Sequence, residues 1–289
     1  MKYFYFILLS IIVMISGYGF LSAQIHLNTA IELYKNKEYE KAKAYLLEEY
    51  KTDNKNAEVN FYLGCCYLML KDHDKAIDYF ENAVEIEETN AEYHYKLGEA
   101  LGIKAQHSNV IKQAWMASRI KKEFEKALEL DSTHLGARIA CISFYTQAPS
   151  VMGGDLDKAK KLIKGLPPSQ HRMAESLSLD IDMKEGNNKL AAKKFAELDS
   201  TFNDSTDHYS FYNKYGYFLL NQKLYDKAII MFKRQVTLAP DEANPYDSLG
   251  DGYRAAGKYA EAIAQYKIAI ELDPEMEISR KKMKEIQDK

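Results

Sequence analysis

The side chains that could support acid-base, nucleophilic or metal chemistry are scattered along this chain. Histidines stand at seven positions, namely His26, His73, His94, His107, His134, His171 and His208. No two of them have the His-Glu-x-x-His spacing that puts two imidazoles on one helix face to bind zinc. His73 lies between two aspartates at a turn between predicted helices, which is typical of a solvated loop. The sequence therefore predicts no metal site.

Nucleophilic and phosphate-binding motifs are missing from the sequence as well. The three cysteines, Cys65, Cys66 and Cys141, are odd in number and do not form a disulfide framework, so we expect small buried side chains. Gly153 and Gly154 lack the Lys-Ser/Thr pair of a phosphate loop, and no Gly-x-Ser-x-Gly occurs. We expect a protein that is not an enzyme and has no cofactor. An enzyme would need a buried carboxylate or histidine cluster near Trp115.

The amino-acid composition limits the kinds of partner that the chain can bind. The chain has 289 residues, 46% of them hydrophobic, with 39 basic against 42 acidic side chains and a net charge of -3. A nucleic-acid-binding protein usually carries a basic stripe, and this balance offers none. The partner is expected to be a protein or peptide, and the sequence indicates no oligomeric state.

Residues 1–24 differ in composition from the rest of the chain. One lysine precedes an apolar run over 3–15, two glycines break the run, and Ser22 and Ala23 follow. This layout predicts a secretory signal peptide over 1–24, cut near Ala23 or Gln24. The alternative is an uncleaved N-terminal anchor, because the run approaches the ~18 residues of a spanning helix. A membrane contact is expected only through this segment, and only if it is uncleaved.

The remaining sequence repeats. Segments 62–90 and 248–276 share Leu-Gly, a tyrosine three residues later, an alanine, and an aromatic residue four positions beyond that alanine. The alanine recurs as Ala42, Ala76, Ala159, Ala191, Ala228 and Ala262, and its bulky partner as Leu46, Phe80, Ile163, Phe195, Phe232 and Tyr266. Residues four apart lie on one helix face, so the alanine lets two helices approach and the bulky residue fills the space beside it.

These motifs resemble the tetratricopeptide repeat, a 34-residue pair of antiparallel helices. The resemblance covers 25–275. It implies an all-α, right-handed superhelical solenoid of about seven helix pairs, followed by a charged capping helix over 276–289.

Two insertions interrupt the repeat. Phe80 and Phe124 are 44 residues apart, ten more than one repeat, and the extra residues fall at about 102–119. A helical period continues from Val110 to Phe124 after a cap at Ser108 or Asn109, so we interpret this insertion mainly as a lengthened second helix. The next unit has an apolar loop at 148–154.

The two insertions are expected to meet, because they occupy the same turn of neighbouring repeats. We expect the loop to fold over the lengthened helix near Trp115. Either the loop only seals an irregular edge, or it frames a partner-binding site made of Trp115, Pro149, Met152, Gly153 and Gly154. Residues 91–165, with "KKEFEKALELD" and "FYTQAPSVMGGDLDKA", also resemble a narrower group of exported bacterial tetratricopeptide proteins.

The family resemblance implies a groove along the first helices. The residues at positions two, five, nine and twelve of each unit would line this groove and contact a ligand. The groove residues would be Phe61, Cys65, Leu68, Tyr95, Glu99, Asn213, Tyr217, Asp247, Asp251 and Arg254. The N-terminal part would be apolar and aromatic, and the C-terminal part polar and acidic. The alternative is that these residues only pack between adjacent first helices.

Together these features predict a non-catalytic protein- or peptide-binding scaffold in the bacterial periplasm or cell envelope. The alternative is a structural subunit of an envelope complex, tethered to the inner membrane by an uncleaved N-terminal helix.

Overall fold

The computed structural model describes residues 26–201 and 209–288, and the predicted signal peptide lies outside these ranges. In the described ranges all regular structure is helical. The prediction of an all-α array of paired helices is confirmed.

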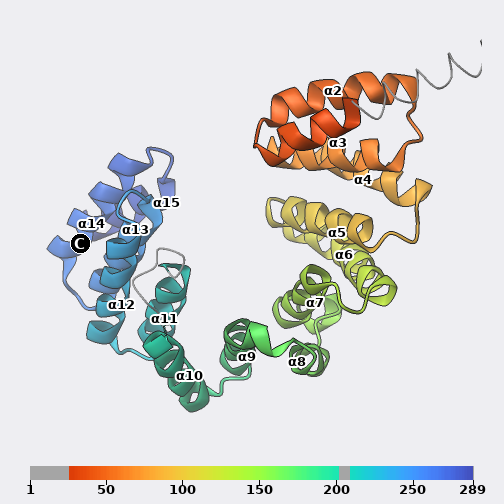
Figure 1. The fold of residues 1–289 in the computed structure, drawn as a ribbon. Coiled ribbons are helices and arrows are strands. Elements are labelled where there is room, and N and C mark those ends of the chain that lie inside the picture. Colours follow the sequence, from red (N-terminus) through yellow and green to blue (C-terminus); the bar gives the residue numbers. More distant parts are fainter. Residues whose placement is uncertain (1–25, 202–208, 289) are drawn as a thin grey trace, which may run out of the picture. The chain divides into compact units, whose positions relative to one another are not determined.

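The helices follow each other through short turns (Figure 1). In chain order they are 26–35, α2 (Tyr39–Thr52), α3 (Ala57–Met69), α4 (His73–Ile86), α5 (Ala91–Gln106), α6 (Val110–Leu130), α7 (Leu135–Gln147), α8 (Leu156–Lys164), α9 (His171–Lys184), α10 (Asn188–Thr201), α11 (Tyr209–Asn221), α12 (Tyr225–Leu238), α13 (Ala243–Ala255), α14 (Tyr259–Leu272) and α15 (Glu277–Gln287). Two single-turn helices, η1 (Ser150–Met152) and η2 (Pro168–Gln170), flank α8.

The chain divides into two compact units. The N-terminal unit ends at Gly186 and the C-terminal unit begins at Asn187. In the N-terminal unit each helix from α2 to α9 contacts the next, and α3, α5, α7 and α9 also contact one another in succession. In the C-terminal unit α11 contacts α13 in the same way. The first helices of successive pairs therefore form a row within each unit.

The predicted alanine-aromatic pairs form the core. Ala76 and Phe80 of α4 are fully buried, and so are Ala262 and Tyr266 of α14. A glycine also lies opposite four of the aromatic rings, those of Phe80, Phe124, Phe232 and Tyr266; a Cβ on Gly64 would lie 2.7 Å from the ring of Phe80. The second helix can therefore lie directly on the backbone of the first helix.

The lengthened second helix α6 begins at a clear N-cap. Asn109 caps α6, accepting a hydrogen bond from the backbone N–H of Lys112 at 3.0 Å. The α6 helix has 21 residues where α4 has 14, and α5 has 16 where α3 has 13. The last helix, α15, covers the end of the array and buries Ile286 against Tyr266.

Candidate partner-binding site

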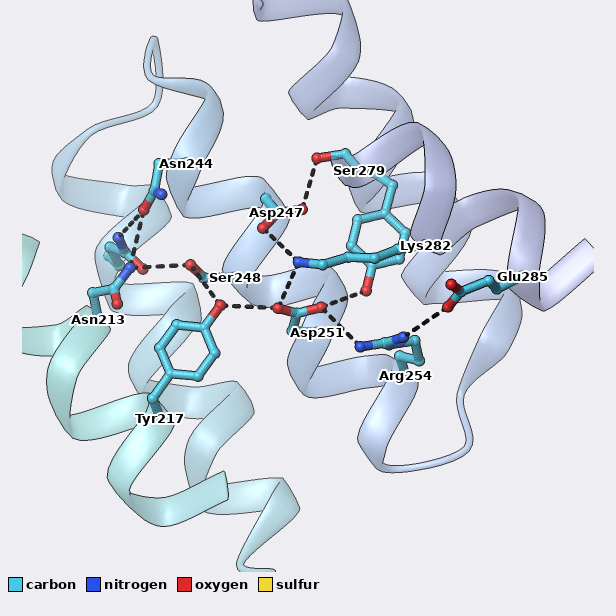
Figure 2. A network of polar contacts seen from close by, with 12 residues as sticks. Asn213, Tyr217, Asn244, Asp247, Ser248, Asp251, Arg254, Ser279, Lys282 and Glu285 are labelled. Atoms are coloured by element: carbon cyan, nitrogen blue, oxygen red, sulfur yellow. Dashed lines mark hydrogen bonds and ion pairs between the residues drawn. The ribbon is translucent and has the colours of Figure 1, made fainter. Parts of the chain in front are cut away.

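The C-terminal unit carries a polar network on its first helices α11, α13 and α15 (Figure 2). Between α11 and α13, the Asn213 amide donates to Asn244 Oδ1 and to Ser248 Oγ, both at 3.0 Å. The Tyr217 hydroxyl donates to Asp251 Oδ2 at 2.9 Å. These bonds hold two adjacent first helices in register through their side chains.

The same arrangement recurs between α13 and α15 with charged groups. The Lys282 ammonium donates to Asp247 Oδ2 and to Asp251 Oδ2, both at 2.8 Å. Ser279 Oγ donates to the other oxygen of Asp247 at 2.7 Å. The side chains of Lys282, Asp247 and Asp251 are 17%, 11% and 13% exposed. Charged groups so far removed from water need such partners, and Lys282 bridges the two carboxylates of the predicted acidic part of the groove.

Asp251 is the centre of the network. Besides Tyr217 and Lys282, its carboxylate accepts a hydrogen bond at 2.7 Å from the Tyr266 hydroxyl of α14 and lies 3.6 Å from Arg254. Both carboxylate oxygens are thus satisfied. Burial raises the pKa of Tyr217 and of Tyr266 well above the usual tyrosine range, and the carboxylate of Asp251 raises both further, so both hydroxyls remain donors at neutral pH.

What a partner can reach is the rim of this network. Asn244 is exposed, and Asn213, Tyr217 and Arg254 are partly exposed. Arg254 also lies 3.5 Å from Glu285 of α15. The rim offers amide donors and acceptors, one hydroxyl and a paired guanidinium, which suit the backbone and polar side chains of a bound chain segment.

The N-terminal groove residues are placed differently. Phe61 and Cys65 are buried, and the Phe61 ring stacks on Tyr93 of α5 with 4.8 Å between ring centroids. Burial raises the pKa of the Cys65 thiol to about 12, so the thiol stays protonated. The prediction that these two residues line an apolar groove is wrong, because the next first helix covers both.

The other predicted residues of this part are partly exposed. Leu68 packs against the core. Tyr95 lies 5.0 Å from the ring of His134, and Glu99 pairs with Lys96 at 2.7 Å. Of the predicted groove residues in the N-terminal unit, Tyr95 and Glu99 are therefore the two that present polar groups at the surface.

The sequence did not lead us to expect contacts from the sixth position of each first helix. Lys282 and Ser248 are 34 residues apart and both insert between the fifth and ninth positions of the preceding first helix. Lys96 is the equivalent residue of α5, and its charge acts on Cys65 of α3. The 34-residue spacing of Ser248 and Lys282 was the available signal.

The edge residues do not form one site. The 148–154 loop contacts the lengthened helix α6 as expected, but not near Trp115, which is 78% exposed. The η1 turn contacts α6 two turns further on, where a Cβ on Gly153 would lie 3.2 Å from Lys121 Cδ. The loop closes on itself, with the N–H of Gly154 bonded to the carbonyl of Pro149 at 3.1 Å.

The loop itself has a tight backbone. Gly153 has φ of +96°, which favours glycine. A Cβ on Gly154 would lie 1.9 Å from the carbonyl oxygen of Ala148, so only glycine fits. Pro149 is exposed and Met152 is half-buried. This geometry explains the Gly-Gly pair by backbone packing alone.

Among the described residues no group of three His, Cys, Asp or Glu side chains is placed to hold a metal ion. Within the same ranges, none of the helices has the length and apolar character needed to cross a membrane.

Comparison with known proteins shows the repeat directly. Residues 57–90, 209–242 and 243–276 each match a family model described as tetratricopeptide repeat. A solved tetratricopeptide repeat protein from Parabacteroides merdae is similar over 92% of this chain and 99% of that chain, with 12% identity and a TM-score of 0.74. The Cut9–Hcn1 hetero-tetramer structure is similar over 89% of this chain and 48% of that chain, with 14% identity and a TM-score of 0.62. These likenesses show the fold.

The curated relatives are much longer proteins. Human Superkiller complex protein 3 is 23% identical over 76% of this chain, and the match spans 14% of the human protein. Superkiller protein 3 of Schizosaccharomyces pombe is 25% identical over 54% of this chain and 9% of its own length. The similarity is confined to a small part of these relatives.

Proposed function

We propose, on the premise that this chain is a tetratricopeptide repeat protein, that it is a non-catalytic scaffold for a protein or peptide partner. The observation that carries the proposal is the network on α11, α13 and α15, whose charged groups are already paired with one another. A site whose side chains are held in place before binding loses little entropy when a partner docks. The rim then supplies the hydrogen bonds.

The partner that fits this rim is an extended chain segment. Amide side chains such as those of Asn213 and Asn244 can donate to and accept from a peptide backbone. Arg254 and Glu285 offer both charge signs at the α15 end, so a segment with a polar or charged side chain there suits the site. A deeply buried apolar anchor is not expected, since Asp247 and Asp251 fill the floor.

A photo-crosslinking residue at position 244 tests this proposal. Asn244 is exposed on α13, so we expect the crosslinker to capture a discrete protein band in cells that express the chain. The matched control places the crosslinker at Ile230, which is exposed on the second helix α12 away from the rim. Arg254→Ala should weaken the band from position 244 by about tenfold, the loss of ~1.4 kcal/mol expected for a charged hydrogen bond. Equal bands from both positions would contradict the proposal.

The compartment is proposed from the sequence alone. The apolar run over 3–15 with small residues at 22 and 23 supports export and cleavage, which would place the scaffold in the bacterial periplasm or envelope. The second candidate is a structural envelope subunit that keeps this segment as a tether, supported by the length of the same run.

Mass spectrometry of the chain isolated from envelope fractions separates the two candidates. We expect a mature chain that begins near residue 24, because signal peptidase cuts after small residues. A mass equal to that of all 289 residues in the membrane fraction would instead support the tethered subunit. Recovery only from the cytosol would contradict both.

A further inference from the structure

The first turns of α6 carry a second apolar stripe that the packing of the N-terminal unit does not use. Met116 and Ile120 are buried against the neighbouring helices. Val110, Ile111 and Trp115 are 69%, 81% and 78% exposed. Residues one turn apart lie on the same side of a helix, so these three side chains form a continuous exposed face. We call this face the α6 tip.

The charge around the α6 tip has one sign. Residues 103–122 contain five basic and no acidic side chains. Lys104 pairs with Asp74, Arg119 pairs with Glu81, and Lys121 lies 4.0 Å from Glu125. These contacts engage three of the five cations.

The other two cations, Lys112 and Lys122, are exposed and form no ion pair with any residue of the described ranges. Lys112 lies between Ile111 and Trp115 in the sequence, and Lys122 lies about two turns beyond Trp115 on the same helix. The first turn of α6 carries no acidic side chain, so its positive helix end is also unneutralised. The tip therefore presents apolar groups next to free positive charge.

The size and charge of the tip argue against a second protein. A stable protein interface buries about 800 Å² on each partner, more than three side chains supply. A second copy of this chain would bring like charges together. A tryptophan beside aliphatic side chains and lysines is instead the composition of helices that lie at the surface of an anionic bilayer.

We propose that the α6 tip binds the surface of anionic phospholipid membranes, with Val110, Ile111 and Trp115 entering the interface and Lys112 and Lys122 contacting headgroups. This surface contact differs from the groove and does not depend on the proposed scaffold function.

Trp115 makes the test direct, because it is the only tryptophan in the chain. The full chain is mixed with vesicles of phosphatidylglycerol or of phosphatidylcholine, and tryptophan emission and co-sedimentation are measured. We expect emission to shift to shorter wavelength, and to be quenched by brominated acyl chains, with the anionic vesicles only. Lys112→Glu/Lys122→Glu should weaken the partitioning that the emission shift reports by about tenfold or more.

Two double substitutions to serine distinguish binding through the α6 tip from any other membrane contact. Val110→Ser/Ile111→Ser keeps Trp115 and removes exposed side chains only, and it should reduce the shift as strongly as the charge reversal. Ile230→Ser/Ile278→Ser removes two exposed isoleucines of the C-terminal unit and should leave the shift unchanged. Because every variant keeps the N-terminal residues, differences between them report on the tip.

Three outcomes would overturn the proposal. The first is unchanged Trp115 emission with anionic vesicles. The second is an equal shift with phosphatidylcholine. The third is a shift that follows protein concentration without vesicles, together with a dimer in sedimentation, because a second copy would then cover the tip.

Discussion

Lys282→Met is expected to destabilise the C-terminal unit by about 3 kcal/mol, because it leaves the poorly exposed Asp247 without a cation and Asp251 with only Arg254 at 3.6 Å. The value is at the lower end for a broken buried ion pair, since Asp247 and Asp251 keep some contact with water. The loss should first be seen in α15 and α13, because repeat arrays are stabilised by contacts between neighbours. Hydrogen exchange of these two helices and the urea midpoint measure it.

The neighbouring lysine supplies the control. Lys281 is exposed, so Lys281→Met should change the midpoint by less than about 0.5 kcal/mol. Adding Asp247→Asn to Lys282→Met removes the carboxylate charge that has lost its cation and should restore part of the stability. If Lys282→Met and Lys281→Met unfolded at the same urea concentration, the network would not stabilise the cap.

Gly98→Ala is expected to destabilise the N-terminal unit by about 1–3 kcal/mol, the usual effect of overpacking a core. A Cβ on Gly98 would lie 2.6 Å from the ring of Phe124, so the ring or the helix must move. Such a shift would reduce the contact between α5 and α6. Thermal unfolding followed by circular dichroism gives the change in Tm.

Gly102 lies one turn further along the same helix and has no atom within 4 Å of its would-be Cβ. Gly102→Ala should therefore stabilise α5 by about 0.5–1 kcal/mol, because alanine loses less backbone entropy than glycine in a helix. Opposite signs for the two substitutions would establish that the repeat glycine is required by ring packing. A stabilising Gly98→Ala would contradict this account.

The network of the C-terminal unit changes how its groove is understood. Asp247 and Asp251 are candidate partner-binding residues by their place in the repeat, yet Lys282 of the cap already occupies their oxygens. The cap thus has a second role besides shielding the last apolar face. Its lysine bridges the two carboxylates and orders this surface, whose outer side chains are available.

The sequence by itself determined the fold. The alanine at one position and the bulky residue four positions later, repeated every 34 residues, specify which face of each second helix is buried, because helix periodicity is a local property. The same regularity located the helix pairs, the capping helix and the place where the repeat is interrupted. None of these inferences needs the position of a distant side chain.

The tertiary structure decided which of the groove and edge positions are accessible. Phe61 and Cys65 are buried because α5 covers them, and Asp251 is neutralised by a lysine 31 residues away. Trp115 is exposed, and the 148–154 loop contacts α6 near Lys121 instead. Such outcomes depend on which side chain the neighbouring element inserts, and the spacing within one repeat carries no information about that contact.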